Sequence, residues 1–182
     1  MSFAIKYPRR VVIRKILLAI ARVIIKLLTH FEVTGLENIP KTGPLILAGN
    51  HVASLEALLM AAYSPRLVEF LGTGDIPFDS AYAWITKLYG LIPVNRGNLD
   101  REALKKASDV LLQKGVLGIF PEGGIWNPAQ MEAQIGVALI SQRTNAPIIP
   151  IGFGGIRGAL PAALHLKKPK ITMDIEIGRA HV

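Results

Sequence analysis

Short apolar runs alternate with helical stretches along the chain after residue 30, and this alternation limits the fold more than any other feature. The runs are rich in aliphatic and β-branched residues, which favour strands. The predicted strands are Phe31–Thr34, Leu45–Ala48, Leu67–Leu71, Leu91–Val94, Val116–Phe120, Ile148–Ile151 and Ile171–Ile177. The predicted helices are Ser54–Tyr63, Ser80–Tyr89, Asp100–Gln113 and Gln130–Arg143. The pattern predicts a single α/β domain whose central sheet is mostly parallel or mixed and is flanked by helices.

Four of the predicted strands are followed at once by a polar or glycine-rich cluster. The clusters are Gly49-Asn50-His51, Asn95-Arg96-Gly97, Pro121-Glu122-Gly123-Gly124 and Gly152-Phe153-Gly154-Gly155. Open α/β sheets bind ligands at the carboxyl ends of their parallel strands. We therefore expect the four clusters to share one edge of the sheet and to form an active site there.

The first cluster supplies a candidate catalytic pair, His51 and Glu56. Histidine can accept a proton near neutral pH, and a carboxylate on its other ring nitrogen fixes the tautomer. At a spacing of five residues the two side chains could not meet inside one helix. They can meet if His51 lies in a loop and Glu56 follows a helix N-cap at Ser54, as the second helical residue. Alternatively, Glu56 only complements the helix dipole and His51 is a hydrogen-bonded histidine at a strand end.

The net charge of +8 comes almost entirely from the first thirty residues, which hold seven lysines and arginines and no acid. Residues 11–28 are predicted to form an amphipathic helix, with an aliphatic face that includes Ile13 and Ile24 and with cations opposite. Such a helix suits the interface of an anionic membrane. The candidate membrane-binding residues are Arg14, Lys15, Ile16, Ile20, Arg22, Val23, Lys26 and Leu27.

Other interpretations of the basic segment are less favoured. A signal peptide would need an uninterrupted apolar region and a cleavage site, but Arg22 and Lys26 interrupt the region. The helix could instead pack on the domain with its charges in solvent. Nucleic-acid binding is not predicted, because aromatic residues make up 7% of the chain and no recognised binding motif is present. No run of eighteen uncharged apolar residues supports a transmembrane helix.

The residues needed for several other kinds of catalytic or binding site are absent from the sequence. Cysteine is absent, which excludes a cysteine nucleophile, and no Gly-x-Ser-x-Gly motif supplies a serine nucleophile. The run from Gly152 to Gly158 nearly matches a dinucleotide-binding motif, but Arg157 stands at the third glycine position. The four histidines have no metal-ligand spacing, so neither a metal nor a bound cofactor is predicted.

The order and spacing of the clusters resemble the 1-acylglycerol-3-phosphate O-acyltransferase family of the glycerolipid acyltransferase superfamily. The family's first motif, Asn-His followed by four residues and an aspartate, is matched by Asn50, His51 and Glu56. The other three motifs are matched in order by Leu91–Gly97, Phe120–Gly123 and Ala146–Gly152. By this resemblance, residues 1–30 form a membrane-anchoring helix and residues 31–182 an acyltransferase domain.

The resemblance implies transfer of a fatty acyl group from acyl-CoA or acyl-carrier-protein to the hydroxyl of lysophosphatidic acid, giving phosphatidic acid. His51 would be the general base and Glu56 would orient it, while Asn50 and backbone amides would hold the developing oxyanion. The implied substrate-binding residues are Asn50, Arg96, Gly97, Glu122, Gly123 and Pro150, with Arg96 on the acceptor phosphate. The enzyme would associate with the cytoplasmic face of a membrane as a peripheral or monotopic protein.

Three departures from the family pattern keep alternatives open. Glu56 replaces the usual aspartate, Gly124-Ile125-Trp126 replaces a Thr-Arg-Ser segment, and Gln134 replaces a common lysine. A site with fewer cations could take another lysolipid or a glycolipid as the acceptor. A lengthened acid could also mark a catalytically silent, membrane-binding relative.

Overall fold

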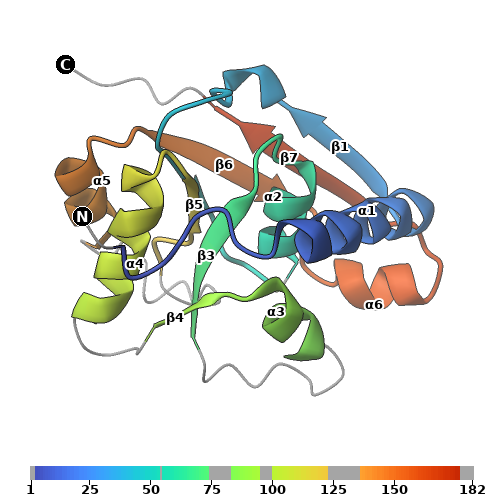
Figure 1. The fold of residues 1–182 in the computed structure, drawn as a ribbon. Coiled ribbons are helices and arrows are strands. Elements are labelled where there is room, and N and C mark those ends of the chain that lie inside the picture. Colours follow the sequence, from blue (N-terminus) through green and yellow to red (C-terminus); the bar gives the residue numbers. More distant parts are fainter. Residues whose placement is uncertain (1–2, 54, 74–82, 95–99, 123–135, 177–182) are drawn as a thin grey trace.

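The computed structural model describes residues 3–53, 55–73, 83–94, 100–122 and 136–176, and these ranges form one seven-stranded sheet with helices on both faces (Figure 1). The strands are β1 (His30–Thr34), β2 (Leu45–Gly49), β3 (Val68–Thr73), β4 (Ile92–Val94), β5 (Val116–Ile119), β6 (Ile148–Gly154) and β7 (Lys170–Ile175). The helices are α1 (Val11–Leu28), α2 (Glu56–Tyr63), α3 (Ala83–Tyr89), α4 (Arg101–Leu112), α5 (Gly136–Thr144) and α6 (Ala159–Leu164), with a 3₁₀ turn, η1 (Leu36–Asn38).

The sheet is mixed, as the sequence predicts. Its strand order is β1-β7-β6-β2-β5-β3-β4, and the five strands from β6 to β4 are parallel. Strand β7 runs antiparallel to β6, and β1 runs parallel to β7. The parallel strands β2, β5 and β6 therefore end at one edge of the sheet, here called the carboxyl edge, and β7 and β1 begin there.

The two faces of the sheet are covered unequally. Helices α1, α2 and α6 pack on one face, whose core includes Leu47, Phe70 and Met173. Helices α4 and α5 cover the other face over β2, β5, β3 and β4, with a core around Ile46 and Leu117. Figure 1 shows α4 and α5 together on one side and α1, α2 and α6 on the other. On β6, β7 and β1, alternate residues of the α4/α5 side are exposed or half-buried, and we call this area the open face.

Helix α1 is apolar on two sides, one packed on the domain and one exposed. Leu18 and Ile25 belong to the core, and Arg14 on the same side is fully buried. The Arg14 guanidinium forms a bidentate ion pair with Glu69 of β3 at 2.6 and 2.8 Å and stacks over the Tyr89 ring. The prediction that Arg14 binds a membrane is therefore wrong, because a buried carboxylate already holds its charge.

The segment before α1 runs across the domain from α4 to the start of α1 (Figure 1). The Ala4 amide donates to Asp109 of α4 at 2.6 Å, and the Tyr7 hydroxyl donates to the Leu67 carbonyl at 2.6 Å. Arg9 donates to Glu69 and to the Gly90 carbonyl. Arg9, one of the seven cations in the first thirty residues, therefore helps to fix the start of α1 to β3 and to the end of α3.

Most element positions agree with the sequence predictions, and α1 has the predicted bounds. Two elements, η1 and α6, were not predicted from the sequence. Gly152 and Gly154, predicted to follow a strand, lie inside β6. The predicted starts of α3 at Ser80 and α5 at Gln130 lie outside the described residues. Within the described ranges, no helix has both the length and the apolar character needed to cross a membrane.

Candidate active site

The loop that joins β2 to α2 brings the predicted catalytic pair together at the carboxyl edge. The Nδ1 atom of His51 lies 3.7 Å from Oε2 of Glu56, whose side chain is completely buried. Glu56 is the first residue of α2 and not the second as predicted, and Leu55 stands at the N-cap. Ser54, the predicted N-cap, lies outside the described residues.

The second oxygen of Glu56 holds the loop in shape. Oε1 accepts hydrogen bonds from the backbone amides of Val52 and Ala53 at 2.7 and 2.6 Å. Burial by itself would raise the pKa of Glu56, but the contact with His51 and these amides outweigh it and lower the pKa below its ordinary value. The carboxylate is therefore charged at neutral pH, with one oxygen fixed by the loop and the other facing His51.

The imidazole of His51 is held between a charged and an aromatic neighbour. Its ring stacks on Phe120, at the end of β5, with centroids 4.5 Å apart and an interplanar angle of 24°. The His51 side chain is 15% exposed. Because Nδ1 faces Glu56, Nε2 is the ring nitrogen left to accept a proton from a substrate.

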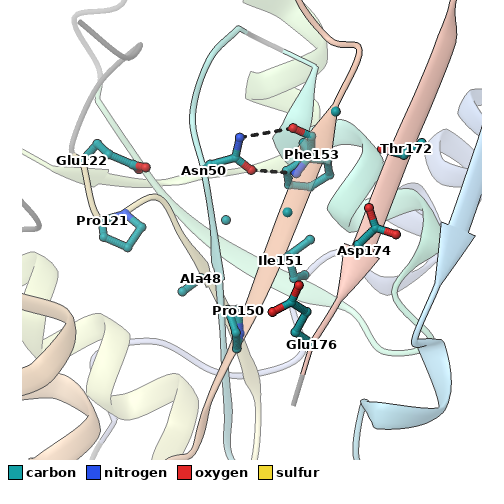
Figure 2. A pocket seen from close by; sticks show the side chains of 13 residues that line it. Ala48, Asn50, Pro121, Glu122, Pro150, Ile151, Phe153, Thr172, Asp174 and Glu176 are labelled. Carbon is teal, nitrogen blue, oxygen red and sulfur yellow. Dashed lines mark hydrogen bonds between the residues drawn. The ribbon is translucent and has the colours of Figure 1, made fainter. Parts of the chain in front are cut away.

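The side chain of Asn50 extends the pairing of β2 with β6. Its Oδ1 accepts from the Phe153 amide at 2.7 Å, and its Nδ2 donates to the Phe153 carbonyl at 3.3 Å (Figure 2). This amide fixes the backbone next to His51, so its role in this structure is to position the loop. Direct contact of Asn50 with a substrate stays a prediction.

A pocket of about 600 Å³ opens beside His51 and Glu56, the predicted catalytic pair, and extends over the open face. Figure 2 shows Asn50, Pro121 and Glu122 on one side of it and Thr172 and Asp174 on the other. The remaining described lining residues are Ala48, Gly49, Pro150, Ile151, Gly152, Phe153, Gly154 and Glu176. Neither His51 nor Glu56 lines it, but it adjoins them through the neighbouring Asn50 and through Pro121, which follows Phe120.

The described lining of this pocket is acidic. Glu122, Asp174 and Glu176 contribute carboxylates, and no lysine or arginine is among the described lining residues. Asp174 accepts a hydrogen bond from the Thr34 hydroxyl at 2.6 Å. The Oε2 atom of Glu122 is buried and has no hydrogen-bond partner in the described part of the chain. These groups suit hydroxyl or amino donors better than a phosphate.

The structure brings three of the predicted substrate-binding residues together in one pocket: Asn50, Glu122 and Pro150. The other three predicted residues, Arg96, Gly97 and Gly123, lie outside the described residues. The contribution of β7 to the pocket was not predicted from the sequence. The strict alternation of polar and apolar residues from Lys170 to Glu176 shows that one face of β7 is polar, but it does not place β7 beside β6.

Most predicted membrane-binding residues of α1 lie on its surface. Ile16, Ile20, Val23 and Leu27 are each more than half exposed, and Lys15 and Lys26 are exposed beside them. Arg22 is also at the surface, where its Nε donates to the Ala62 carbonyl of α2. The helix therefore presents an aliphatic stripe that the described part of the domain does not cover.

Curated relatives are similar to part of this chain. The 1-acyl-sn-glycerol-3-phosphate acyltransferase of Borreliella burgdorferi is 34% identical over 96 residues, which cover 50% of this chain and 37% of that protein. The enzyme of the same name from Pseudomonas aeruginosa is 28% identical over 126 residues, covering 67% of this chain and 48% of that protein. The alignments thus span less than half the length of either relative.

The fold is also similar to a crystal structure, that of the 1-acyl-sn-glycerophosphate (LPA) acyltransferase PlsC from Thermotoga maritima. The TM-score is 0.64 with 19% sequence identity, and the alignment covers 98% of this chain and 75% of that chain. At this identity the similarity establishes the fold. The sequence profile described as Acyltransferase matches residues 30–154, which span every strand of the sheet except β7 and include His51 and Glu56. The chain belongs to the Acyltransferase family.

Proposed function

We propose that this chain transfers a fatty acyl group from a thioester donor to the hydroxyl of a lysophospholipid. The observation that supports this proposal most is the His51–Glu56 pair at the carboxyl edge, inside the segment that matches the family. Both curated relatives carry the name 1-acyl-sn-glycerol-3-phosphate acyltransferase, which favours lysophosphatidic acid as the acceptor and phosphatidic acid as the product.

The geometry suits a direct transfer without an acyl-enzyme. Nε2 of His51 removes the proton from the acceptor hydroxyl as its oxygen attacks the thioester carbonyl. A carbon–oxygen bond forms, the carbon–sulfur bond breaks, and the proton on His51 passes to the departing thiolate. The buried carboxylate of Glu56 stabilises the imidazolium between these steps. Acyl-CoA and acyl-carrier-protein both supply the required thioester.

The acidic pocket favours a second candidate acceptor. A phosphomonoester carries nearly two negative charges and would be repelled by Glu122, Asp174 and Glu176 if it entered this pocket. The predicted contact of Arg96 with the acceptor phosphate would agree with the first candidate. A lysolipid or glycolipid with a neutral, hydroxylated or amino-bearing headgroup would instead donate hydrogen bonds to the carboxylates.

The exposed aliphatic stripe of α1 favours function at a membrane. Such a face, with Lys15 and Lys26 beside it, suits the interfacial region of an anionic leaflet. A peripheral or monotopic position on the cytoplasmic side would give access to acyl-CoA or acyl-carrier-protein in solution and to lysolipid in the membrane.

The test is an acceptor screen with purified protein, lipid vesicles and labelled acyl-CoA or acyl-carrier-protein, followed by mass spectrometry of the lipid products. The parent should form phosphatidic acid or another diacyl lipid, and His51→Ala should not. Absence of product with every acceptor and donor, from a protein that is folded and vesicle-bound, would favour a silent membrane-binding relative.

A further inference from the structure

We propose that the turn between α6 and β7 is a second membrane contact, which inserts Leu164 and Leu166 into the same anionic bilayer that α1 binds. The proposal rests on the proposed membrane association of α1 and adds a site on a different element. We call residues 164–168 the leucine turn.

The leucine turn exposes two large apolar side chains to solvent. Leu166 is 73% exposed, the largest value among the exposed large hydrophobic residues of the described chain, and Leu164 is 60% exposed. Single exposed leucines are common on soluble proteins, but here two lie within three residues of each other where α6 ends and the turn begins. The turn therefore resembles the exposed stripe of α1 in character.

The backbone of the leucine turn is held in shape rather than loose. Leu166 has a φ of 57° and Lys168 a φ of 44°, in the left-handed region that side chains other than glycine and asparagine rarely adopt. The amide of Leu166 donates to Ala163 at 2.9 Å, and that of Lys167 donates to Ala162 at 3.0 Å. Such a conformation persists only where surrounding contacts impose it, and here it directs an apolar side chain into solvent.

The charges around the turn suit an anionic surface. Lys167 and Lys168 are exposed, and neither forms an ion pair with a described residue. Lys170, in contrast, pairs with Glu32 at 3.1 Å. Two unpaired cations directly after two exposed leucines place charge at headgroup level when the leucines enter the acyl region. A symmetric contact between two copies of the turn would bring these lysines together, which disfavours self-association.

The leucine turn lies next to the end of α1. The amide of His30, two residues after α1, donates to the Pro169 carbonyl at 3.0 Å, and His30 pairs with Lys170 in the sheet. Leu27, near the end of α1, is 63% exposed. Because β7 and β1 begin at the carboxyl edge, the leucine turn and the end of α1 both lie at the edge that carries His51. Two separate contacts would also prevent the domain from rolling about the axis of α1 on the bilayer.

The absence of cysteine from the chain allows a direct test. Single cysteines are introduced by Leu166→Cys, by Ile20→Cys on α1, and by Leu112→Cys at the end of α4, on the opposite face of the sheet, where the parent leucine is 53% exposed. Each is labelled with an environment-sensitive fluorophore and mixed with phosphatidylcholine–phosphatidylglycerol vesicles. We expect blue-shifted emission and quenching by nitroxide-labelled lipid at positions 166 and 20, and no change at 112.

A second experiment measures the affinity of variants of the leucine turn for the same vesicles. The double variant Leu164→Ser/Leu166→Ser should partition into the vesicles about tenfold or more weakly than the parent, because two apolar side chains no longer enter the bilayer. Its thermal unfolding should match that of the parent, since both leucines are exposed. The matched control Leu112→Ser should bind vesicles as the parent does.

Each outcome decides the proposal. A response at 20 without one at 166 would limit membrane contact to α1 and overturn the proposal, as would silence at both positions. A response at 166 that depends on protein concentration and needs no vesicles would assign the turn to a contact between copies. A lipid response at 166 in a protein without acyl transfer would support the leucine turn and count only against the proposed function.

Discussion

Nδ1 of His51 and Oε2 of Glu56 lie 3.7 Å apart, and neither atom has a hydrogen-bond partner among the described residues. The gap is longer than a hydrogen bond by about 0.8 Å, a separation typical of catalytic pairs that tighten when substrate binds. Because the other oxygen of Glu56 is fixed by two backbone amides, a small movement of the imidazole would be sufficient to close the gap.

Replacement of His51 by alanine should reduce acyl transfer by about 10²–10⁴-fold or more, since the general base is lost. The His51 side chain is 15% exposed and mainly contacts Phe120 and Glu56, so the fold should persist. Thioester release with a lysolipid acceptor gives the rate, and circular dichroism checks the fold. An unchanged rate in a folded variant would exclude His51 as the base.

Glu56→Gln should be less stable than the parent at neutral pH, and this difference in stability should disappear in acid. The pKa of Glu56 is lower when folded than its ordinary value of 4.5, so the charged carboxylate stabilises the folded protein fully above that value. This stabilisation is lost as the pH falls through the lower folded-state pKa. Urea unfolding of both proteins across this range gives the difference in unfolding free energy. A gap that widens on acidification would contradict the pKa direction.

Arg14→Met should destabilise the fold by about 3 kcal/mol or more, because Glu69 is fully buried and would keep only Arg9 as its ionic partner among the described residues. The matched control is Lys15→Met, which removes an exposed charge from the next position of α1. Urea unfolding should show a large loss for the first variant and a change within about 0.5 kcal/mol for the second. Equal effects would mean that the buried pair contributes little.

Ile16→Ser/Ile20→Ser should weaken binding to anionic vesicles by roughly 30- to 1,000-fold, from about 1–2 kcal/mol of lost burial at each position. Both side chains are more than half exposed, so unfolding should change little. The contrasting variant Leu18→Ser, on the buried side, should mainly destabilise the domain. Vesicle co-sedimentation separates the two effects, and unaltered binding by the double variant would move the anchor away from this face.

Asp174→Asn/Glu176→Gln should lower the KM for lysophosphatidic acid severalfold if the phosphate lies near the acidic pocket, because two like charges are removed. If instead a headgroup with hydroxyl or amino donors occupies the pocket, the KM for that acceptor should rise. Titrations of lysophosphatidic acid and of a zwitterionic lysolipid, with parent and variant, compare the two cases. No change with either acceptor would place the headgroup elsewhere.

Local periodicity accounts for the part of the fold that the sequence predicts. The apolar runs and helix faces depend on residues a few positions apart, and such patterns give the bounds of α1 and, to within one residue at each end, those of α4. Helix α6 has only six residues and contains Pro161, so it has no extended apolar face to detect. The proximity of His51 and Glu56 was also predictable, because both residues belong to one short loop and helix start.

Contacts between distant segments account for what the sequence does not predict. Arg14 looks like one more cation of a basic helix until β3 brings Glu69, 55 positions away, against it. The acidic lining from Asp174 and Glu176 likewise depends on β7 lying beside β6. The first feature follows from the packing of α1 on β3 and the second from strand order, and alternating hydrophobicity specifies neither.

Helix α1 is fixed to the sheet near both ends, through Arg14 to β3 and through the following His30 to the start of β7. A free amphipathic peptide of this sequence would have to order its backbone when it meets lipid, at a cost of about 1–2 kcal/mol for each residue. Here that ordering has already occurred during folding of the domain. Vesicle binding should therefore leave the helical content unchanged, and its strength should depend on how well a rigid surface fits the bilayer rather than on a helix–coil equilibrium.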